Sequence, residues 1–245
     1  FLEDTVHQIT KGSFTVNNYN YSPDGKKIIF SHQEDTNINT GFINTDISII
    51  DSNGDNLKNL VIRPGLDSNP IFSGDGKKFA FISSGGNEEP IGLRGVHIYN
   101  LKDNKIVKLS NTPNRDSRIV SWTTDNKMLI ISENIKTTSQ LLLLPVNGDN
   151  YISWSLINYN EGVITSVVKS KLSENIAFCY EKLDSPVEVY ISNTKEPSFE
   201  KLSDINNFEY PKLSKTEIIS WKSFDGLEIE GILTYPKNYK KNCYI

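Results

Sequence analysis

Apolar and polar residues alternate along this chain in short stretches that are interrupted by Asp-Gly turns. Around Pro23-Asp24-Gly25, apolar positions alternate with polar ones before the turn, and an apolar, β-rich run follows it. Proline presets φ for a turn, and Asp-Gly tolerates the positive φ that a tight reversal requires. The pattern therefore predicts a β-hairpin, and no stretch of the sequence has the spacing of a long amphipathic helix.

The hairpin pattern recurs about every fifty residues. Its four copies occupy residues 21–30, 72–81, 122–131 and 173–178; the third has Asp-Asn in place of Asp-Gly, and the fourth is worn and has lost the pair. Ile28, Phe79, Leu129 and Ile176 are equivalent and follow one another at intervals of 51, 50 and 47 residues. Self-similarity with such a period is typical of propellers and solenoids. The alternative, four unrelated hairpins, does not explain why the aromatic residue, the aspartate and the second-strand residues recur in step.

Each period carries four predicted strands, which is typical of a propeller blade. In the first period they are expected at residues 18–21, 27–32, 46–51 and 57–62. We predict an all-β fold in which residues 1–213 form a partial β-propeller. Its four full blades are expected at about residues 14–65, 66–114, 115–162 and 163–213. Residues 3–10 end like the later repeats, so we expect them to form one outer strand of a preceding blade.

After residue 213 the pattern changes. Residues 216–223 and 227–236 form two predicted strands around Phe224-Asp225-Gly226, and the second strand begins with strict alternation. This hairpin does not fit the blade pattern. We therefore expect residues 214–245 to be the start of another domain, truncated at Ile245.

Composition excludes two classes of partner. A net charge of −4, a pI near 5.5 and only four arginines argue against a nucleic-acid surface. The longest aliphatic run, Leu141 to Leu144, is far too short to span a membrane, and the residues given contain no secretory signal. Cys179 and Cys243 define no disulfide framework, and Cys179 is expected as a buried free thiol. The compartment, cytoplasmic or periplasmic, stays open.

Three stretches resemble the prolyl oligopeptidase family of serine peptidases, especially its acylaminoacyl-peptidase and dipeptidyl-peptidase-five-like branch. They are the blade motif at residues 22–26, the Pro-x-x-x-Tyr strand at 185–190, and the passage formed by 202–206 and 217–231. In that family the last passage leads from a propeller into an α/β-hydrolase domain. The resemblance covers essentially the whole chain but only a middle portion of a full-length member.

The resemblance implies a propeller that filters substrates, admitting short or unfolded peptides to a hydrolase domain with a nucleophilic serine. Family members have seven or eight blades, whereas this chain shows four, and it stops about where the first hydrolase strand begins. The nucleophile elbow needs Gly-x-Ser-x-Gly, which is absent, since no glycine lies four positions after another. We therefore assign no catalytic residue to this chain and expect it to be inactive alone.

Other candidate chemistry is sparse. His7, His32 and His97 fall in separate predicted strands and form no local metal cluster with cysteine, so no metal or cofactor is expected. Glu88 and Glu89, in a long predicted loop, are candidates for holding a peptide's amino terminus. A solvated acidic loop tip is the favoured alternative, because exposed carboxylates are ordinary. The aromatic residues before the turns are expected to lie between blades rather than to stack bases: Tyr21, Phe72 and Trp122.

A second hypothesis is a non-enzymatic Tol-like propeller that presents its loops to a protein partner. It leaves the segment from Trp221 to Gly231 unexplained, and that segment discriminates the two hypotheses. In either case, open blade edges are expected to let the isolated chain associate with itself.

Overall fold

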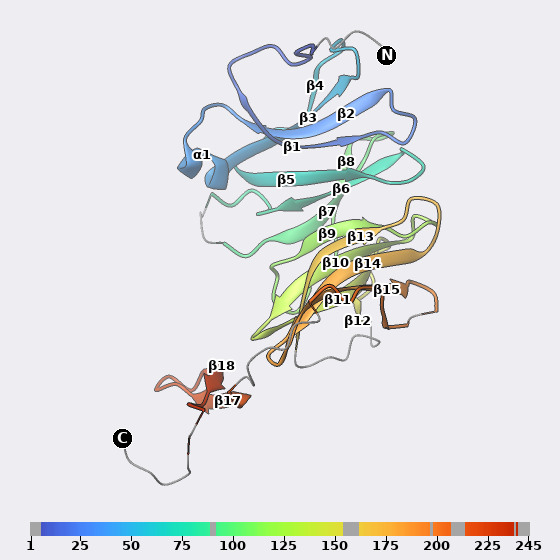
Figure 1. Cartoon of the computed structure of the whole chain (residues 1–245). Helices are drawn as coiled ribbons and strands as arrows, with labels where there is room; N and C mark the ends of the chain where they lie inside the picture. Colours follow the sequence, from blue (N-terminus) through green and yellow to red (C-terminus); the bar gives the residue numbers. More distant parts are fainter. Residues whose placement is uncertain are drawn as a thin grey trace. The chain divides into compact units, whose positions relative to one another are not determined.

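The computed structural model of the chain describes residues 6–88, 92–153, 162–196, 198–206, 214–237 and 239. β-Strands dominate these residues, together with one short helix, α1 (Ile38–Ile43) (Figure 1). No helix in this described part is long and apolar enough to cross a membrane. The chain divides into two compact units, which are considered separately: Phe1–Ile131 with Leu143–Ile152, and Ser132–Leu142 with Ser153–Ile245.

The first two repeats each contain four antiparallel strands. Repeat 1 consists of β1 (Thr15–Tyr21), β2 (Lys27–Gln33), β3 (Asn44–Asp51) and β4 (Lys58–Val61), and repeat 2 of β5 (Gly65–Phe72), β6 (Lys78–Ser83), β7 (Gly95–Asn100) and β8 (Lys105–Lys108). Strands pair in chain order, so each repeat is an up-and-down sheet. A short parallel pairing, Asn44 with Gly65 and Thr45 with Leu66, joins β3 to β5. The hairpins predicted around both Asp-Gly turns are confirmed.

Two further four-stranded sheets and a hairpin follow. Repeat 3 consists of β9 (Arg118–Trp122), β10 (Met128–Ile135), β11 (Thr138–Pro145) and β12 (Ile152–Ser153), and repeat 4 of β13 (Gly162–Lys169), β14 (Asn175–Lys182), β15 (Ser185–Asn193) and β16 (Glu200–Lys201). The boundary between the two units passes through β10 and β11. β17 (Thr216–Lys222) and β18 (Glu228–Thr234) form a separate two-stranded sheet. The all-β architecture of four-stranded repeats is as predicted.

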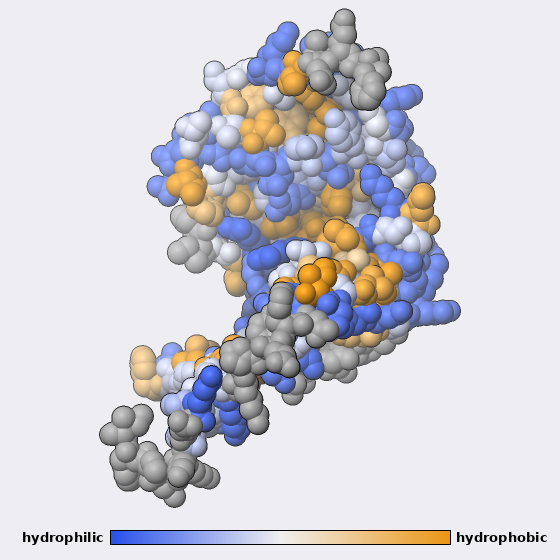
Figure 2. Space-filling model, viewed as in Figure 1, coloured by the Kyte–Doolittle hydropathy of each residue, from blue (hydrophilic) through white to orange (hydrophobic). Residues whose placement is uncertain are grey.

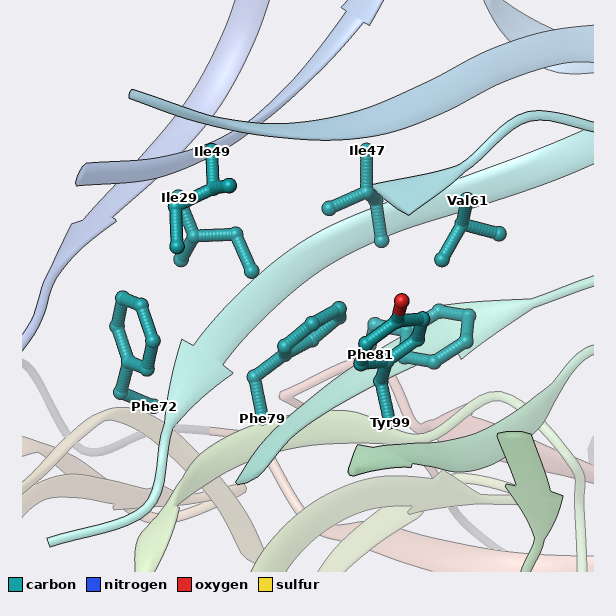
Figure 3. Packing of buried hydrophobic residues seen from close by; sticks show 8 residues of the cluster. All are labelled: Ile29, Ile47, Ile49, Val61, Phe72, Phe79, Phe81 and Tyr99. Carbon is teal, nitrogen blue, oxygen red and sulfur yellow. The ribbon is translucent and has the colours of Figure 1, made fainter. Parts of the chain in front are cut away.

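Repeats 1 and 2 pack face to face through a hydrophobic core. Alternate side chains of a strand share one face, so aliphatic residues of β2, β3 and β4 point toward aromatic residues of β5, β6 and β7 (Figure 3). The aromatic side supplies rings such as Phe79 and Tyr99, which stack with centroids 4.8 Å apart. Each large side chain buried in this way contributes about 1.5–3 kcal/mol. The cluster comprises Ile29, Ile47, Ile49, Val61, Phe72, Phe79, Phe81 and Tyr99.

The same hydrogen bonds close the turns of the first three repeats. A hydroxyl donates to the turn aspartate at 2.6–2.7 Å, and the backbone N–H two residues later donates to the same carboxylate at 3.0–3.1 Å. The residue after the aspartate has positive φ: 70° at Gly25, 66° at Gly76 and 59° at Asn126. The hydroxyl and carboxylate pairs are Ser22 and Asp24, Ser73 and Asp75, and Thr123 and Asp125.

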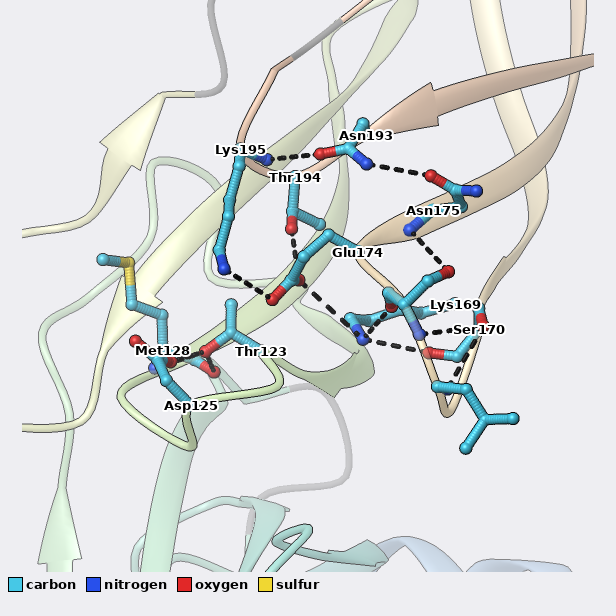
Figure 4. A network of polar contacts seen from close by, with 12 residues as sticks. Thr123, Asp125, Met128, Lys169, Ser170, Glu174, Asn175, Asn193, Thr194 and Lys195 are labelled. Atoms are coloured by element: carbon cyan, nitrogen blue, oxygen red, sulfur yellow. Dashed lines mark hydrogen bonds and ion pairs between the residues drawn. The ribbon is translucent and has the colours of Figure 1, made fainter.

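Repeat 4 closes its turn with a lysine instead. Lys169, at the position that Trp122 holds in repeat 3, has a side chain only 3% exposed. Its ammonium donates to the carbonyl oxygens of Ser170 at 2.9 Å and Ser173 at 2.8 Å, and lies 3.9 Å from the Glu174 carboxylate (Figure 4). In repeat 4 a lysine ammonium therefore binds the turn carbonyls, whereas in the first three repeats an aspartate carboxylate binds a turn N–H group.

The amino-terminal segment differs from its prediction. Residues 6–10 form no strand, and residues 3–5 lie outside the described part. The described residues hold no strand of a preceding sheet with which this segment could pair. Ile9 and Phe14 instead pack on the outer face of repeat 1, against Ile28, Phe30 and Ile50.

Two smaller expectations also need correction. Tyr21 is 54% exposed, not buried between blades. Phe72 and Trp122 are buried as predicted, because each lies against the preceding repeat; Trp122 Nε1, for example, donates to the Ile71 carbonyl at 3.1 Å. Tyr21 belongs to the first repeat and has no such neighbour among the described residues. Cys179 is a free thiol, but it is only partly buried.

Candidate functional site

Three segments meet at one end of repeats 1 and 2, which we call the loop end. They are the β2–β3 connection (residues 34–43), the described parts of the β6–β7 connection (84–88 and 92–94) and the β4–β5 link (62–64). Because consecutive strands run antiparallel, these segments emerge opposite to the Asp-Gly turns. Connections carry binding and catalytic residues more often than strands do, which makes the loop end the first candidate site.

An ion pair between a partly exposed arginine and a buried aspartate lies at the loop end. The guanidinium of Arg63 donates from Nε to Asp67 Oδ2 and from Nη2 to Asp67 Oδ1, both at 2.8 Å, and Nη2 also donates to Ser83 Oγ at 2.8 Å. The Asp67 side chain is 1% exposed, and that hydrogen-bonded carboxylate raises the pKa of Arg63. A planar guanidinium fits a carboxylate in this bidentate way. The pair ties the β4–β5 link to β6, but its groups are already bonded to one another and offer no free nucleophile or base.

The structure also brings His32 and Ser48 together, which no local motif indicates. His32 Nε2 lies 2.7 Å from Ser48 Oγ, and Ser48 Oγ donates to Asn59 Oδ1 at 2.9 Å. Because the hydroxyl proton is directed to Asn59, Nε2 must carry the proton of its own hydrogen bond. A nucleophilic serine requires the reverse, with the imidazole accepting. Ser48 is also only 1% exposed, so this contact is structural.

The other residues considered from the sequence stay apart. His7 is exposed, while His97 is 5% exposed and packs on Phe81 with ring centroids 5.5 Å apart. Burial lowers the pKa of both His32 and His97, so both rings are neutral near pH 7. Glu88 is exposed, and Glu89 lies outside the described residues. The described residues contain no cluster of three or more His, Cys, Asp or Glu side chains that could hold a metal.

A cleft of about 470 Å³ opens between repeats 1 and 2 at the Asp-Gly turns. Apolar side chains such as Leu60 and Phe72 form part of its wall, and Lys27, Asp24 and Asp75 are among its charged residues. Lys27 pairs with Asp51 at 2.6 Å, and the two turn aspartates are held by their own hydroxyl partners. These three side chains are therefore engaged in local structure, and they suggest no reaction in the cleft.

In the second unit, the final hairpin contacts the β10–β11 turn. Glu230 of β18 accepts hydrogen bonds from Thr137 Oγ1 at 2.6 Å and from Thr137 N at 3.3 Å. Lys136 Nζ lies 3.4 Å from Glu228 and 3.7 Å from Glu230. The pKa of Glu230 is lowered, and the hydrogen bond from the Thr137 hydroxyl is the largest cause. The hairpin also carries exposed hydrophobic side chains (Figure 2). Trp221, on β17, is 47% exposed.

Sequence comparison relates the chain to dipeptidyl-peptidases. No family model matches it. It is 26% identical over 141 residues to dipeptidyl-peptidase 5 of Trichophyton equinum, covering 53% of this chain and 19% of that protein. It is 22% identical over 239 residues to dipeptidyl-peptidase 5 of Aspergillus fumigatus, covering 91% of this chain and 33% of that protein. The chain thus spans a third or less of these curated relatives.

Structural comparison identifies the architecture. TolB from Acinetobacter baumannii matches 92% of this chain and 53% of its own at a TM-score of 0.61 and 15% identity. A prolyl endopeptidase matches 93% of this chain and 32% of its own at 0.63 and 12% identity. A puromycin hydrolase mutant matches 89% of this chain and 33% of its own at a TM-score of 0.60 and 13% identity. The repeats are β-propeller blades. At such identities the likeness shows the fold alone, while the sequence matches associate this propeller with peptidases.

Sequence reasoning missed the main polar contacts of the propeller. Arg63 and Asp67 are four residues apart in a link, so their pairing looks local, but Ser83, which completes it, is twenty residues away. Glu230 and Thr137 are 93 residues apart. A lone arginine in a short link, close to an aspartate, was the one available signal for the first contact. No sequence signal indicated the second.

Proposed function

We propose that this chain is the propeller portion of a serine peptidase of the prolyl oligopeptidase family, and that it gates access to a hydrolase domain. The substrates of the whole protein would be short peptides, cleaved to release dipeptidyl or acylaminoacyl groups. The observation that carries the proposal is the likeness to dipeptidyl-peptidase 5, which extends over 91% of this chain. The β17–β18 hairpin supports it, because a propeller alone does not require this separate two-stranded sheet.

A Tol-like binding module is the alternative. TolB shares the fold over 92% of the chain, but a prolyl endopeptidase does so equally well, so fold does not separate the two functions. Sequence likeness favours the peptidase. In the whole protein, acyl transfer would proceed through an activated serine with a histidine as general base. This chain would contribute selection of substrate by size, and the His32 and Ser48 contact would take no part in the reaction.

The reading frame that contains this chain tests the proposal. A Gly-x-Ser-x-Gly segment downstream of residue 245 would support a peptidase. A stop codon directly after residue 245 would support a binding module. The protein encoded by the full frame should hydrolyse dipeptidyl or N-acylaminoacyl p-nitroanilides, with rates that fall as the peptide lengthens. Hydrolysis of folded proteins and short peptides at equal rates would contradict the gating role.

The 245-residue chain alone should not react with a fluorophosphonate probe. Its Gly-x-Ser-x-Gly motif is absent, and the hydroxyl of Ser48 donates to Asn59 rather than to a base. Labelling is measured by mass spectrometry, with heat-denatured chain as the control. Stoichiometric labelling that heat abolishes would reveal a nucleophile, and a Ser48→Ala variant would show whether Ser48 is that residue.

A further inference from the structure

A small hollow lies on the outer face of repeat 1, at the loop end. Its volume is about 270 Å³. Phe14, Phe30 and His32 contribute three rings to its wall, with centroids 5.1–6.0 Å apart. Glu34 and Asp46 contribute two carboxylates. We call this cavity the outer hollow; its remaining lining residues are Ser13, Ser48, Leu57, Asn59 and Ile62.

The internal repeat shows what occupies the same place in repeat 2. The 51-residue interval makes Phe30 equivalent to Phe81 and His32 equivalent to Ser83. Strand register agrees, since Ser48 lies opposite Phe30 and His97 lies opposite Phe81. In repeat 2 this corner is filled by the guanidinium of Arg63, which bonds Ser83 Oγ and Asp67.

No arginine stands at the equivalent position of repeat 1. The residue 51 positions before Arg63 is Gly12, which has no side chain to reach the corner. The hollow is therefore the space that an arginine occupies one repeat later. The carboxylate of the hollow comes from β3, not from the strand equivalent to the one that carries Asp67. Asp46 lies opposite His32, and the equivalent pair in repeat 2 is Gly95 opposite Ser83.

The lining of the outer hollow suits a cation. It contains two acidic side chains and no lysine or arginine side chain. Asp46 is half-buried and accepts one long hydrogen bond, from Arg63 N at 3.3 Å, so its carboxylate retains lone pairs for another donor. Aromatic rings around such a cavity attract cations through their π faces. The neutral His32 ring adds no opposing charge.

We propose that the outer hollow binds a guanidinium group, with Asp46 and Glu34 as its anionic partners and the three rings as its apolar wall. The site is distinct from the peptidase function proposed above and does not depend on it. Two sources share this chemistry, a free guanidino compound and an arginine side chain of a peptide or protein.

The test is a titration of the full 245-residue chain followed by NMR of its histidine rings. Ethylguanidine is the probe, and neutral ethylurea, which has nearly the same shape, is the matched control. We expect saturable shifts of the His32 ring signals with ethylguanidine, with a Kd on the order of 1 mM, and none with ethylurea. His97, buried between the repeats, should not respond.

Two variants locate the binding. Asp46→Asn keeps an oxygen for Arg63 N but removes the charge, and should weaken binding at least about tenfold, the effect of one lost charge-assisted contact. Glu34→Gln changes an exposed side chain, folds normally, and should weaken binding about threefold. Asp103→Asn, on an exposed turn of repeat 2, is the control and should bind like the unchanged chain. If the His97 signals of Asp46→Asn differ from those of the native chain, that variant is not correctly folded. The test of the proposal then rests on Glu34→Gln.

A second probe identifies the source. An acetylated and amidated peptide with one internal arginine is titrated in parallel. Binding at least as tight as that of ethylguanidine supports an arginine side chain as the natural ligand, whereas binding of ethylguanidine alone supports a free small molecule. The proposal is overturned if His32 does not respond to ethylguanidine, responds equally to ethylurea, or responds unchanged in the decisive variant.

Discussion

A single residue with positive φ completes each of the first three turns, and the three positions show how much the residue type matters. Glycine stands at two of them and asparagine at the third. Asparagine tolerates the left-handed region better than most residues with a side chain, and Asn126 Oδ1 also accepts a hydrogen bond from Gly74 N at 2.6 Å. The third turn thus keeps the conformation and gains a contact with repeat 2.

Valine at either glycine should destabilise the fold. Gly25→Val and Gly76→Val place a β-branched residue at φ of 70° and 66°, and the expected loss is about 1–3 kcal/mol for each. Urea unfolding of the two variants measures it. Lys26→Val and Lys77→Val, one position later and without positive φ, are the matched controls and should change little. Unchanged midpoints in both glycine variants would contradict the role given to these turns.

The buried ammonium of repeat 4 should matter far more than an exposed one beside the same carboxylate. Lys169→Met removes the donor for two turn carbonyls and should cost about 1–3 kcal/mol. Lys195 also contacts Glu174, at 3.6 Å, but its side chain is 73% exposed. Lys195→Met should therefore change the free energy of unfolding by less than about 0.5 kcal/mol. Equal losses in the two variants would show that Lys169 does not hold the turn.

At the scale of elements, strands with local signals were predictable. The Asp-Gly turns place both strands of a hairpin next to each other in sequence, so β1 with β2, β5 with β6 and β17 with β18 follow from residue pattern alone. The 47-residue interval also places Lys169 at the position of Trp122, so repeat 4 could have been recognised as altered there. Its bonding to Ser170 and Ser173 was not foreseeable from that interval.

Features that depend on what packs against an element were not predictable. Tyr21 has the same local sequence context as Phe72, but burial there requires a preceding repeat. The contact between His32 and Ser48 arises from the register of β2 on β3, which is set by a connection that the hydrophobic pattern leaves undefined. The same reason hid the candidate sites, because Arg63 with Ser83 and the outer hollow both join residues from different strands.

The contact of the β17–β18 hairpin should depend on pH. The pKa of Glu230 is lowered from its ordinary value of 4.5, chiefly by the Thr137 hydroxyl. A carboxyl with a lowered folded pKa stabilises its contact fully above its ordinary value, and the contact is lost as the pH falls through the lowered value. The amide proton of Thr137, which donates to Glu230 at 3.3 Å, reports this directly by NMR.

The Thr137 amide shift should be constant above pH 5 or so and change with a midpoint below the ordinary glutamate value. Glu230→Gln should remove this transition. Glu228→Gln is the matched control: its carboxylate is 62% exposed and lies 3.4 Å from Lys136, so the transition should persist. A transition that survives in Glu230→Gln would assign it to another group.

At the scale of the whole molecule, the two termini of the described chain differ in what covers them. Ile9 and Phe14 pack on the outer face of repeat 1, so that face is less open than the expectation of uncovered blade edges assumed. Within the described part of the chain, several apolar side chains of the final hairpin stay exposed. Trp221 is 47%, Leu227 64% and Phe224 103% exposed.

The isolated 245-residue chain should therefore associate with itself mainly through β17 and β18. A two-stranded sheet is marginal in water by itself. Among the described residues both strands of this one are edges, whose free backbone groups can pair with another chain. Exposed apolar side chains at its turn add hydrophobic area to such a contact. Sedimentation velocity across a concentration series should show species larger than a monomer, and the double variant Phe224→Ser with Leu227→Ser should shift the distribution toward monomer. The pair Val107→Ser with Ile106→Ser, on the exposed strand β8, tests the competing blade-edge route. A monomer at every concentration would mean that neither edge mediates association. Loss of association in the β8 variant alone would show that the chain associates through the blade edge and not through the hairpin.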